Sequence, residues 1–166
     1  TLKDYDQIIH KISQSLTWEE FIDISKRLKN KVKYTYLFAA DNYEGLVCNY
    51  FELLYGQQGS IFDGDTIRLN TPVALKELNL LIDFIHKYHF VPDSVSSFDE
   101  YQCYVYALEN DVPFIKGWPG FMQQYYGKIP NYEKMKGIKA APLPHFKGFK
   151  STSVYGGWNL MIPKDS

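Results

Sequence analysis

Residues 34–56 read YTYLFAADNYEGLVCNYFELLYG, a short apolar run followed by a longer segment with helical periodicity. The run from Tyr34 to Ala40 is β-branched or aromatic for most of its length, which predicts a strand buried in a sheet. A helix should follow it from about Tyr43 to Tyr55. Because open α/β sheets bind ligands where a strand ends and a helix starts, the connecting loop is a candidate binding loop.

The ends and the buried face of this helix can also be predicted. Asp41 or Asn42 is expected to cap its start, and Gly56 to close it. The inward residues should be Leu46, Val47, Tyr50, Phe51 and Leu54. The segment then forms one strand, one loop and one amphipathic helix in succession.

Further helices are predicted on either side of this unit from periodicity and capping residues. Thr17 with Glu20, and Ser97 with Glu100, have the spacing of capping boxes, and Thr71-Pro72 supplies an N-cap with proline at the first helical position. The expected helices cover residues 4–16, 17–28, 71–88, 97–108 and 121–126. In the longest of them, Leu75, Leu78, Ile82 and Ile85 are expected to face inward.

Three extended regions complete the predicted fold. Residues 61–69 contain Asp63-Gly64 between apolar alternations and predict a β-hairpin. Residues 112–116 predict a short strand, and the proline-rich end of the chain predicts the last strands. Strands that alternate with helices imply an α/β fold, a three-layer lobe whose mixed sheet is flanked by helices.

Composition limits the possible functions. The 166 residues fit one domain. A net charge of −1, with Lys and Arg spread along the chain, gives no electrostatic footprint for a phosphate backbone, so we expect no nucleic-acid partner. Aromatic residues make up 17% of the chain, so stacking surfaces are abundant. No apolar run approaches the roughly 18 residues of a membrane span. The chain starts at Thr1 without Met, and we expect it to be a piece of a longer protein.

Metal and redox sites are not indicated. Cys48 and Cys103 lack C-x-x-C spacing and are expected to be buried, although a disulfide between them stays open. His86 and His89 would share a helix face, but no third ligand is near them, and cations also favour a helix C-terminus. The hairpin acids lack the twelve-residue calcium loop. We therefore expect no metal and no cofactor.

An aromatic or acidic residue recurs beside a glycine at three places: Tyr43-Glu44-Gly45, Trp118-Pro119-Gly120 and Gly156-Gly157-Trp158. An aromatic ring can cover the C–H face of a sugar while a carboxylate accepts hydrogen bonds from its hydroxyls. The alternative for the last motif is a glycine bulge followed by a core Trp. The candidate ligand-binding residues are Tyr43, Glu44, Trp118, Gly156, Gly157 and Trp158.

Two other functions remain open at this point. Glu44 with Asp41 or Asp63 could form a glycosidase pair, but the sequence gives no distance between them and no recognisable acid–base framework supports the pair. Phosphate loops, nucleophile elbows and zinc-protease motifs are also missing, and we expect no catalytic residues and no enzyme. The same aromatic residues could instead serve a protein-interaction domain. A panel of oligosaccharides watched for products would test the first alternative, and Trp fluorescence with added sugar the second.

From Thr17 to Asp165 the chain resembles the middle and C-terminal lobe of bacterial extracellular solute-binding proteins of the maltose-binding type, which serve ABC sugar importers. The motifs that carry this resemblance are residues 17–21, Tyr43-Glu44-Gly45, Thr71-Pro72, residues 114–118, Ala141-Pro142-Leu143-Pro144, Gly156-Gly157-Trp158-Asn159-Leu160 and Ile162-Pro163. The chain departs from the family pattern at residues 108–111 and in lacking a proline-rich lead into Thr17.

The resemblance implies that residues 1–166 form one lobe of a two-lobed, type II periplasmic-binding-protein fold, with residues 160–166 leading toward the hinge and a missing lobe. Tyr43 and Glu44 would contact the sugar, Trp118 would stack on it, and Gly156, Gly157 and Trp158 would line the same cleft. It further implies a monomer in the periplasm, or a lipoprotein on the outer face of the membrane, that delivers a carbohydrate to the permease of an ABC importer.

Overall fold

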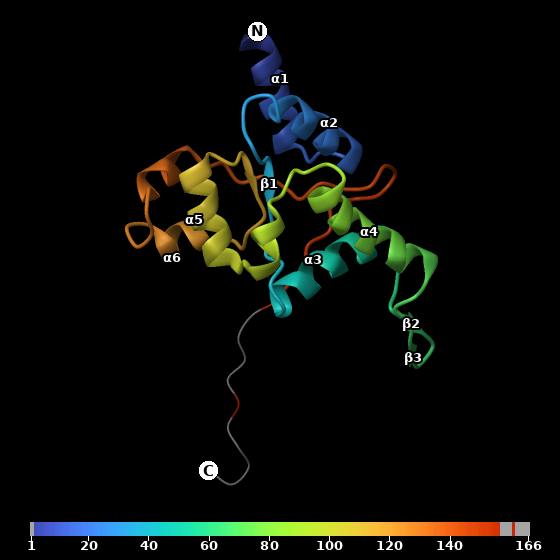
Figure 1. Cartoon of the computed structure of the whole chain (residues 1–166). Coiled ribbons are helices and arrows are strands. Elements are labelled where there is room, and N and C mark those ends of the chain that lie inside the picture. Colours follow the sequence, from blue (N-terminus) through green and yellow to red (C-terminus); the bar gives the residue numbers. More distant parts are fainter. Residues whose placement is uncertain (1, 157–160, 162–166) are drawn as a thin grey trace.

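The computed structural model describes residues 2–156 and 161, and it is a helix-rich α/β lobe (Figure 1). Strand β1 lies near the centre, with α5 and α6 on one side of it and α3 and α4 on the other. The elements are α1 (Leu2–Ser13), α2 (Trp18–Leu28), β1 (Tyr36–Leu37), α3 (Glu44–Tyr55), β2 (Phe62–Asp63), β3 (Thr66–Ile67), α4 (Pro72–His86), η1 (Asp93–Ser97), α5 (Glu100–Asn110), β4 (Phe114–Ile115), α6 (Phe121–Tyr125) and η2 (Tyr132–Gly137).

The central sheet is a parallel pair. Strand β1 pairs with β4 in the register Tyr36 to Phe114 and Leu37 to Ile115. The run that we predicted as one strand is buried as expected, yet only two of its residues pair with β4. Several of its other backbone groups bond to loops, for example the amide of Ala40 to the carbonyl of Phe98 at 3.0 Å.

The predicted hairpin forms, but it does not join this sheet. Strands β2 and β3 pair with each other, Phe62 opposite Ile67, as a separate two-stranded sheet. In Figure 1 the hairpin projects away from α3 and α4. The α/β class is thus confirmed. In place of the single mixed sheet that we expected, the described residues form one small parallel sheet and one small antiparallel sheet. The described residues of the proline-rich end add one bridge, between His145 and Thr17, rather than regular strands.

Two of the predicted helix starts are confirmed in detail. Thr17 and Glu20 form the reciprocal capping box, and the Thr71 side chain accepts from the amide of Ala74 at 3.2 Å, with Pro72 following it. The box at α5 is shifted: Asp99 and Gln102 form it, not Ser97 and Glu100. A one-turn 3-10 helix ends at Ser97, so the chain enters α5 two residues later than the sequence pattern indicates.

Helix α3 also differs at its start. Tyr43 occupies the N-cap position in extended conformation without a side-chain cap, while the Asp41 carboxylate accepts from the amide of Asn42. Neither Asp41 nor Asn42 therefore caps the helix. Val47, predicted inward, is 46% exposed, because Cys48 and Asn49 take the buried positions.

The face of α4 that we predicted to be buried is largely exposed. Leu75, Leu78 and Ile82 are each more than 40% exposed. The buried stripe instead holds Ala74, Glu77, Leu81 and Phe84. Phe84 decides this orientation, since its ring lies in the aromatic core, with centroids 5.6 to 6.3 Å from those of Trp18, Phe21, Tyr36, Tyr88 and Phe90.

The core has one large and one small part. The large part joins α2, β1, α4 and α5, and a smaller cluster of Tyr104, Leu108, Ile129 and Met135 holds α5 against η2. Cys48 and Cys103 are buried free thiols, and burial raises the pKa of Cys103 to about 12. None of the helices in the described part of the chain combines the length and the apolarity needed to cross a membrane.

Candidate functional site

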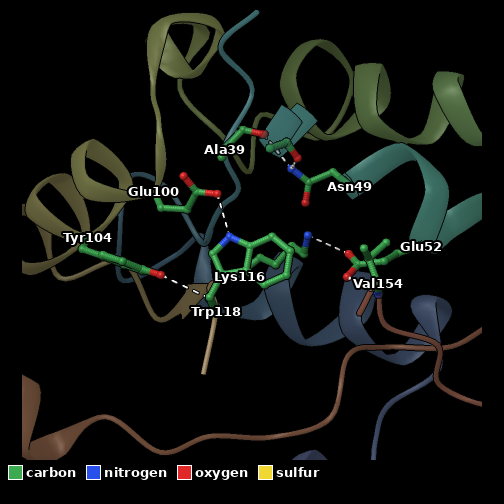
Figure 2. Close-up of polar contacts among 9 residues, drawn as sticks. Ala39, Asn49, Glu52, Glu100, Tyr104, Lys116, Trp118 and Val154 are labelled. Carbon is green, nitrogen blue, oxygen red and sulfur yellow. Dashed lines mark hydrogen bonds and ion pairs between the residues drawn. The ribbon is translucent and has the colours of Figure 1, made fainter. Parts of the chain in front are cut away.

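Tyr43 and Glu44 lie where the sequence predicts them, directly after the first strand. Asn49 fixes this junction, since its side-chain amide donates to the carbonyl of Ala39 at 2.6 Å and to that of Gly45 at 2.8 Å (Figure 2). A Cβ at Gly45 would collide with the Tyr43 phenol, so glycine lets that ring lie over the first turn of α3. Tyr43 is half-buried and Glu44 is exposed.

Trp118 follows the other strand of the parallel pair. Because β1 and β4 are parallel, the segments after them leave the sheet at the same end. The backbone amide of Trp118 donates to the Tyr104 hydroxyl at 3.3 Å, and a Cβ at Gly117 would collide with that hydroxyl. The chain can therefore pass close to α5 here, and it presents a half-buried indole ring.

Glu100 joins the two aromatic residues and was not among the predicted site residues. Its Oε1 accepts from Trp118 Nε1 at 2.8 Å, and its Oε2 accepts from the Tyr43 hydroxyl. Three elements thus meet at one carboxylate: the α3 start, the α5 start and the segment after β4. Figure 2 shows the bond from Trp118 to Glu100. The sequence did not predict that Glu100 bonds to both aromatic residues, because its pattern assigned Glu100 to a capping box with Ser97. Asp99 and Gln102 form the capping box instead.

Hydrogen bonding decides the charge of this cluster. Burial by itself would raise the pKa of Glu100, but the donors Tyr43 and Trp118 outweigh that effect and hold its pKa below the ordinary value. The pKa of Tyr43 moves upward through burial and through its bond to Glu100, so the phenol keeps its proton. At neutral pH the site therefore consists of a carboxylate held between two neutral aromatic side chains.

A buried ion pair connects this end of the sheet with the last described segment. Lys116 Nζ lies 2.6 Å from Glu52 Oε2, with both side chains less than 15% exposed. The other oxygen of Glu52 accepts from the amide of Val154 at 3.1 Å (Figure 2). Lys116 also lies 5.6 Å from the Trp118 ring centroid. Glu52 thereby anchors the segment that carries Gly156 close to β4 and Trp118.

The other sequence candidates have different outcomes. Gly156 is exposed, and a Cβ there would meet open space, so its backbone is accessible. Gly157 and Trp158 lie outside the described residues. The structure brings Tyr43 and Trp118 together through Glu100 and places Glu44 at the adjoining helix start.

Metal binding finds no support in the described part of the chain. Within it, no three His, Cys, Asp or Glu side chains form a group that could hold an ion. His86 Nδ1 lies 4.0 Å from Asp93 Oδ1.

Asp63, which the sequence offers with Glu44 as a glycosidase pair, belongs to the hairpin, and its Oδ2 pairs with Arg68 Nε at 3.1 Å.

Comparison with known proteins agrees with this architecture. The model of the bacterial extracellular solute-binding protein family matches residues 6–166. A probable ABC transporter-binding protein of Deinococcus radiodurans is 28% identical over 156 residues, covering 88% of this chain and 36% of that protein.

Two solved structures share the fold. A solute-binding protein of an ABC transporter from Thermotoga lettingae TMO, bound with α-D-tagatose, superposes with a TM-score of 0.73 and 25% identity, over 92% of this chain and 38% of that one. Maltose-bound MalE3 of T. maritima superposes with a TM-score of 0.68 and 22% identity, over 84% and 36%. This chain thus spans little more than a third of each relative's length. With a family model that covers nearly all of it, the chain belongs to the bacterial extracellular solute-binding proteins.

Proposed function

We propose that residues 1–166 form one lobe of a two-lobed receptor that binds a carbohydrate outside the cytoplasm and delivers it to the permease of an ABC importer. The receptor has no catalytic activity of its own. Family membership supports the transport role, and the sugars named for two structural relatives, maltose and tagatose, support the ligand class. The partial coverage of those relatives supports a second lobe beyond this chain.

The observation that carries the proposal is the Glu100 carboxylate held between Tyr43 and Trp118. A pyranose or furanose has an apolar C–H face and a rim of hydroxyls. The ring of Trp118 can cover that face, while Glu100 and Glu44 accept hydrogen bonds from the hydroxyls. Gly156, Gly157 and Trp158 would complete the cleft by close backbone approach and a second stacking ring.

A single lobe can supply stacking and some hydrogen bonds, but it cannot enclose a ligand. Good small-molecule sites bury about 70–90% of the ligand surface. Closure of a second lobe about a hinge that residues 160–166 approach would provide the missing cover, as in other periplasmic binding proteins. The closed form would then be the one presented to the permease.

The test is a calorimetric titration of the whole gene product that contains these residues with neutral hexoses and maltose. Trp118→Ala should weaken every sugar that binds by about tenfold or more, because a stacking face contributes about 1–2 kcal/mol. Phe62→Ala removes an aromatic ring that is 55% exposed on the hairpin, and it should leave affinity unchanged. Products released from an oligosaccharide panel, or no binding of any sugar, would overturn the proposal.

The need for a second lobe predicts weak sugar binding by this chain alone. The 166-residue chain alone should bind the same sugar with millimolar affinity, about 4 kcal/mol, against about 8 kcal/mol for a micromolar two-lobed receptor. Micromolar binding by the chain alone would contradict the need for a second lobe.

A further inference from the structure

The side-chain donors of Tyr43 and Trp118 are both used within the cluster, so its side chains present acceptors to a ligand. Tyr43 has one side-chain proton, which it donates to Glu100, and Trp118 has one side-chain N–H, which it also donates to Glu100. The backbone N–H of Trp118 is used by Tyr104. What stays available to a ligand is the ring faces, the phenol oxygen and the remaining lone pairs of the carboxylate, about two of its four.

This inventory matches a ligand that donates hydrogen bonds. A sugar hydroxyl can donate to a carboxylate oxygen, and such charge-assisted bonds are about twice as strong as neutral ones. A ligand carboxylate or phosphate at the same place has only lone pairs to offer. It would bring acceptor against acceptor as well as charge against charge.

The charges around the site are negative. Glu100 is ionised at neutral pH because its two donors lower its pKa, and Glu44 is exposed in the first turn of the neighbouring helix. Lys116, whose Nζ lies 5.6 Å from the centroid of the Trp118 ring, is paired with Glu52 at 2.6 Å. The starts of α3 and α5 each add a partial positive charge of about one half, which a full carboxylate in the first turn of each helix outweighs.

We propose that Glu100 makes this site selective for uncharged polyhydroxy ligands and disfavours sugar acids with the same hydroxyl pattern. This inference rests on the proposed function, since it specifies the ligand class of the same site. Glu100 acts directly, as a hydrogen-bond acceptor and as a fixed negative charge, and not only by holding the two rings.

The experiment compares pairs of probes that differ in the oxidation of C6: glucose with glucuronate, and galactose with galacturonate. Isothermal titration of the whole gene product at low salt should give at least about tenfold weaker binding for each acid than for its neutral partner. This difference in affinity between each acid and its neutral partner, the affinity gap, should narrow as salt is raised, because like-charge repulsion at a partly open site is screened.

Glu100→Gln tests the assigned residue. The amide keeps the shape, with an oxygen that accepts from Trp118 and a nitrogen that donates to the Tyr43 oxygen, so the gap between acid and neutral sugar should shrink about tenfold. The control is Glu109→Gln, the same charge change near the far end of α5 at an exposed position, which should leave the gap unchanged. A thermal melt of each variant checks folding, and the salt series on the unmutated protein remains decisive if Glu100→Gln does not fold.

The results separate the two proposals. Equal or tighter binding of the acids, or a gap that Glu100→Gln and salt leave unchanged, would overturn the selectivity while the sugar-binding role stands. Failure of both neutral and acidic sugars to bind would overturn the sugar-binding role, and the selectivity with it.

Discussion

Two partly or fully buried glutamates of this lobe have opposite surroundings. Glu100, in the site, has a donor on each oxygen, from Trp118 and from Tyr43. Glu77, on the inner face of α4, is 0% exposed, and only its Oε1 has a donor, the Gln57 amide, while Oε2 has no partner in the described part of the chain. The pKa of Glu100 lies below its ordinary value, whereas burial raises the pKa of Glu77 to about 7.

The two carboxyls differ in depth and in donors: Glu77 is fully buried with a donor on one oxygen, whereas Glu100 is half-buried with a donor on each. In the candidate site, the side chains of Tyr43 and Trp118 donate to the carboxylate of Glu100 and stabilise its charged form. In α4 the desolvation cost exceeds the contribution of Gln57 and Lys76. Helix α4 therefore buries a carboxyl that is easily protonated, while Leu75, Leu78 and Ile82 stay exposed.

The largest expected effect concerns the packing that turns Glu77 inward. Phe84→Ala should lower the free energy of unfolding by about 3–5 kcal/mol, since it removes a fully buried ring from the aromatic core. Ile82→Ala, two residues away on the exposed face, should cost less than about 1 kcal/mol. Urea denaturation of both variants measures the difference, and equal losses would show that the two faces of α4 are not distinct.

A third buried carboxylate, Glu52, sharpens the comparison because its partner is a cation. Lys116→Met should cost about 3 kcal/mol, since it leaves Glu52 without that partner at a site less than 15% exposed. Lys136→Met breaks the exposed pair with Glu133 and should change stability by less than about 1 kcal/mol. Thermal melts at matched pH provide the measurement. If the two variants melted alike, burial would not matter to these pairs.

The raised pKa of Glu77 gives a pH dependence of known sign. The folded state binds this proton more tightly than the unfolded state, so its contribution is complete below about pH 4.5 and is lost as pH rises to about 7. Glu77→Gln should remove this decline, which amounts to about 3 kcal/mol. Denaturation of both proteins between pH 4.5 and 8 compares the slopes. A steeper decline in the variant than in the parent would contradict the assignment.

The smallest expected effect comes from leaving Glu100 with a side-chain donor on only one oxygen, as Glu77 has. Tyr43→Phe removes one of its two side-chain donors, so the pKa of Glu100 should rise, and stability at pH 7 should fall by about 1 kcal/mol. An NMR titration of the Glu100 carboxyl reads the pKa directly, with Tyr126→Phe, an exposed tyrosine near η2, as the control. An unchanged titration would mean that Trp118 alone stabilises the anion.

Local signals in the sequence predicted much of the fold. Capping residues identified the starts of α2 and α4, and Asp63-Gly64 identified the hairpin. Tyr43 and Trp118 were predicted as site residues because each follows an apolar run, and the parallel pairing of β1 with β4 brings them to the same end. These features depend on neighbours in the chain, which sequence patterns record.

The features that the sequence did not predict depend on contacts between segments far apart in the chain. The period of α4 allows either of two apolar stripes to face inward, and only the fit of Phe84 among rings from α2 and β1 selects one. Glu100 was overlooked for a similar reason. Its partners are 57 and 18 residues away, and a two-residue shift of the capping box frees its side chain to bond to both of them.

The parallel pairing of β1 with β4 also governs when the site can form. Helix α3, the hairpin, α4 and α5 all lie between the two strands in the chain, so their pairing closes a long loop and is a slow, non-local step of folding. Tyr43 follows the first strand and Trp118 the last, and neither can reach Glu100 in its final geometry before that loop is closed. On the ribosome, these two residues can meet only after β4 has left the exit tunnel, so the cluster that we propose as a ligand site forms late in synthesis.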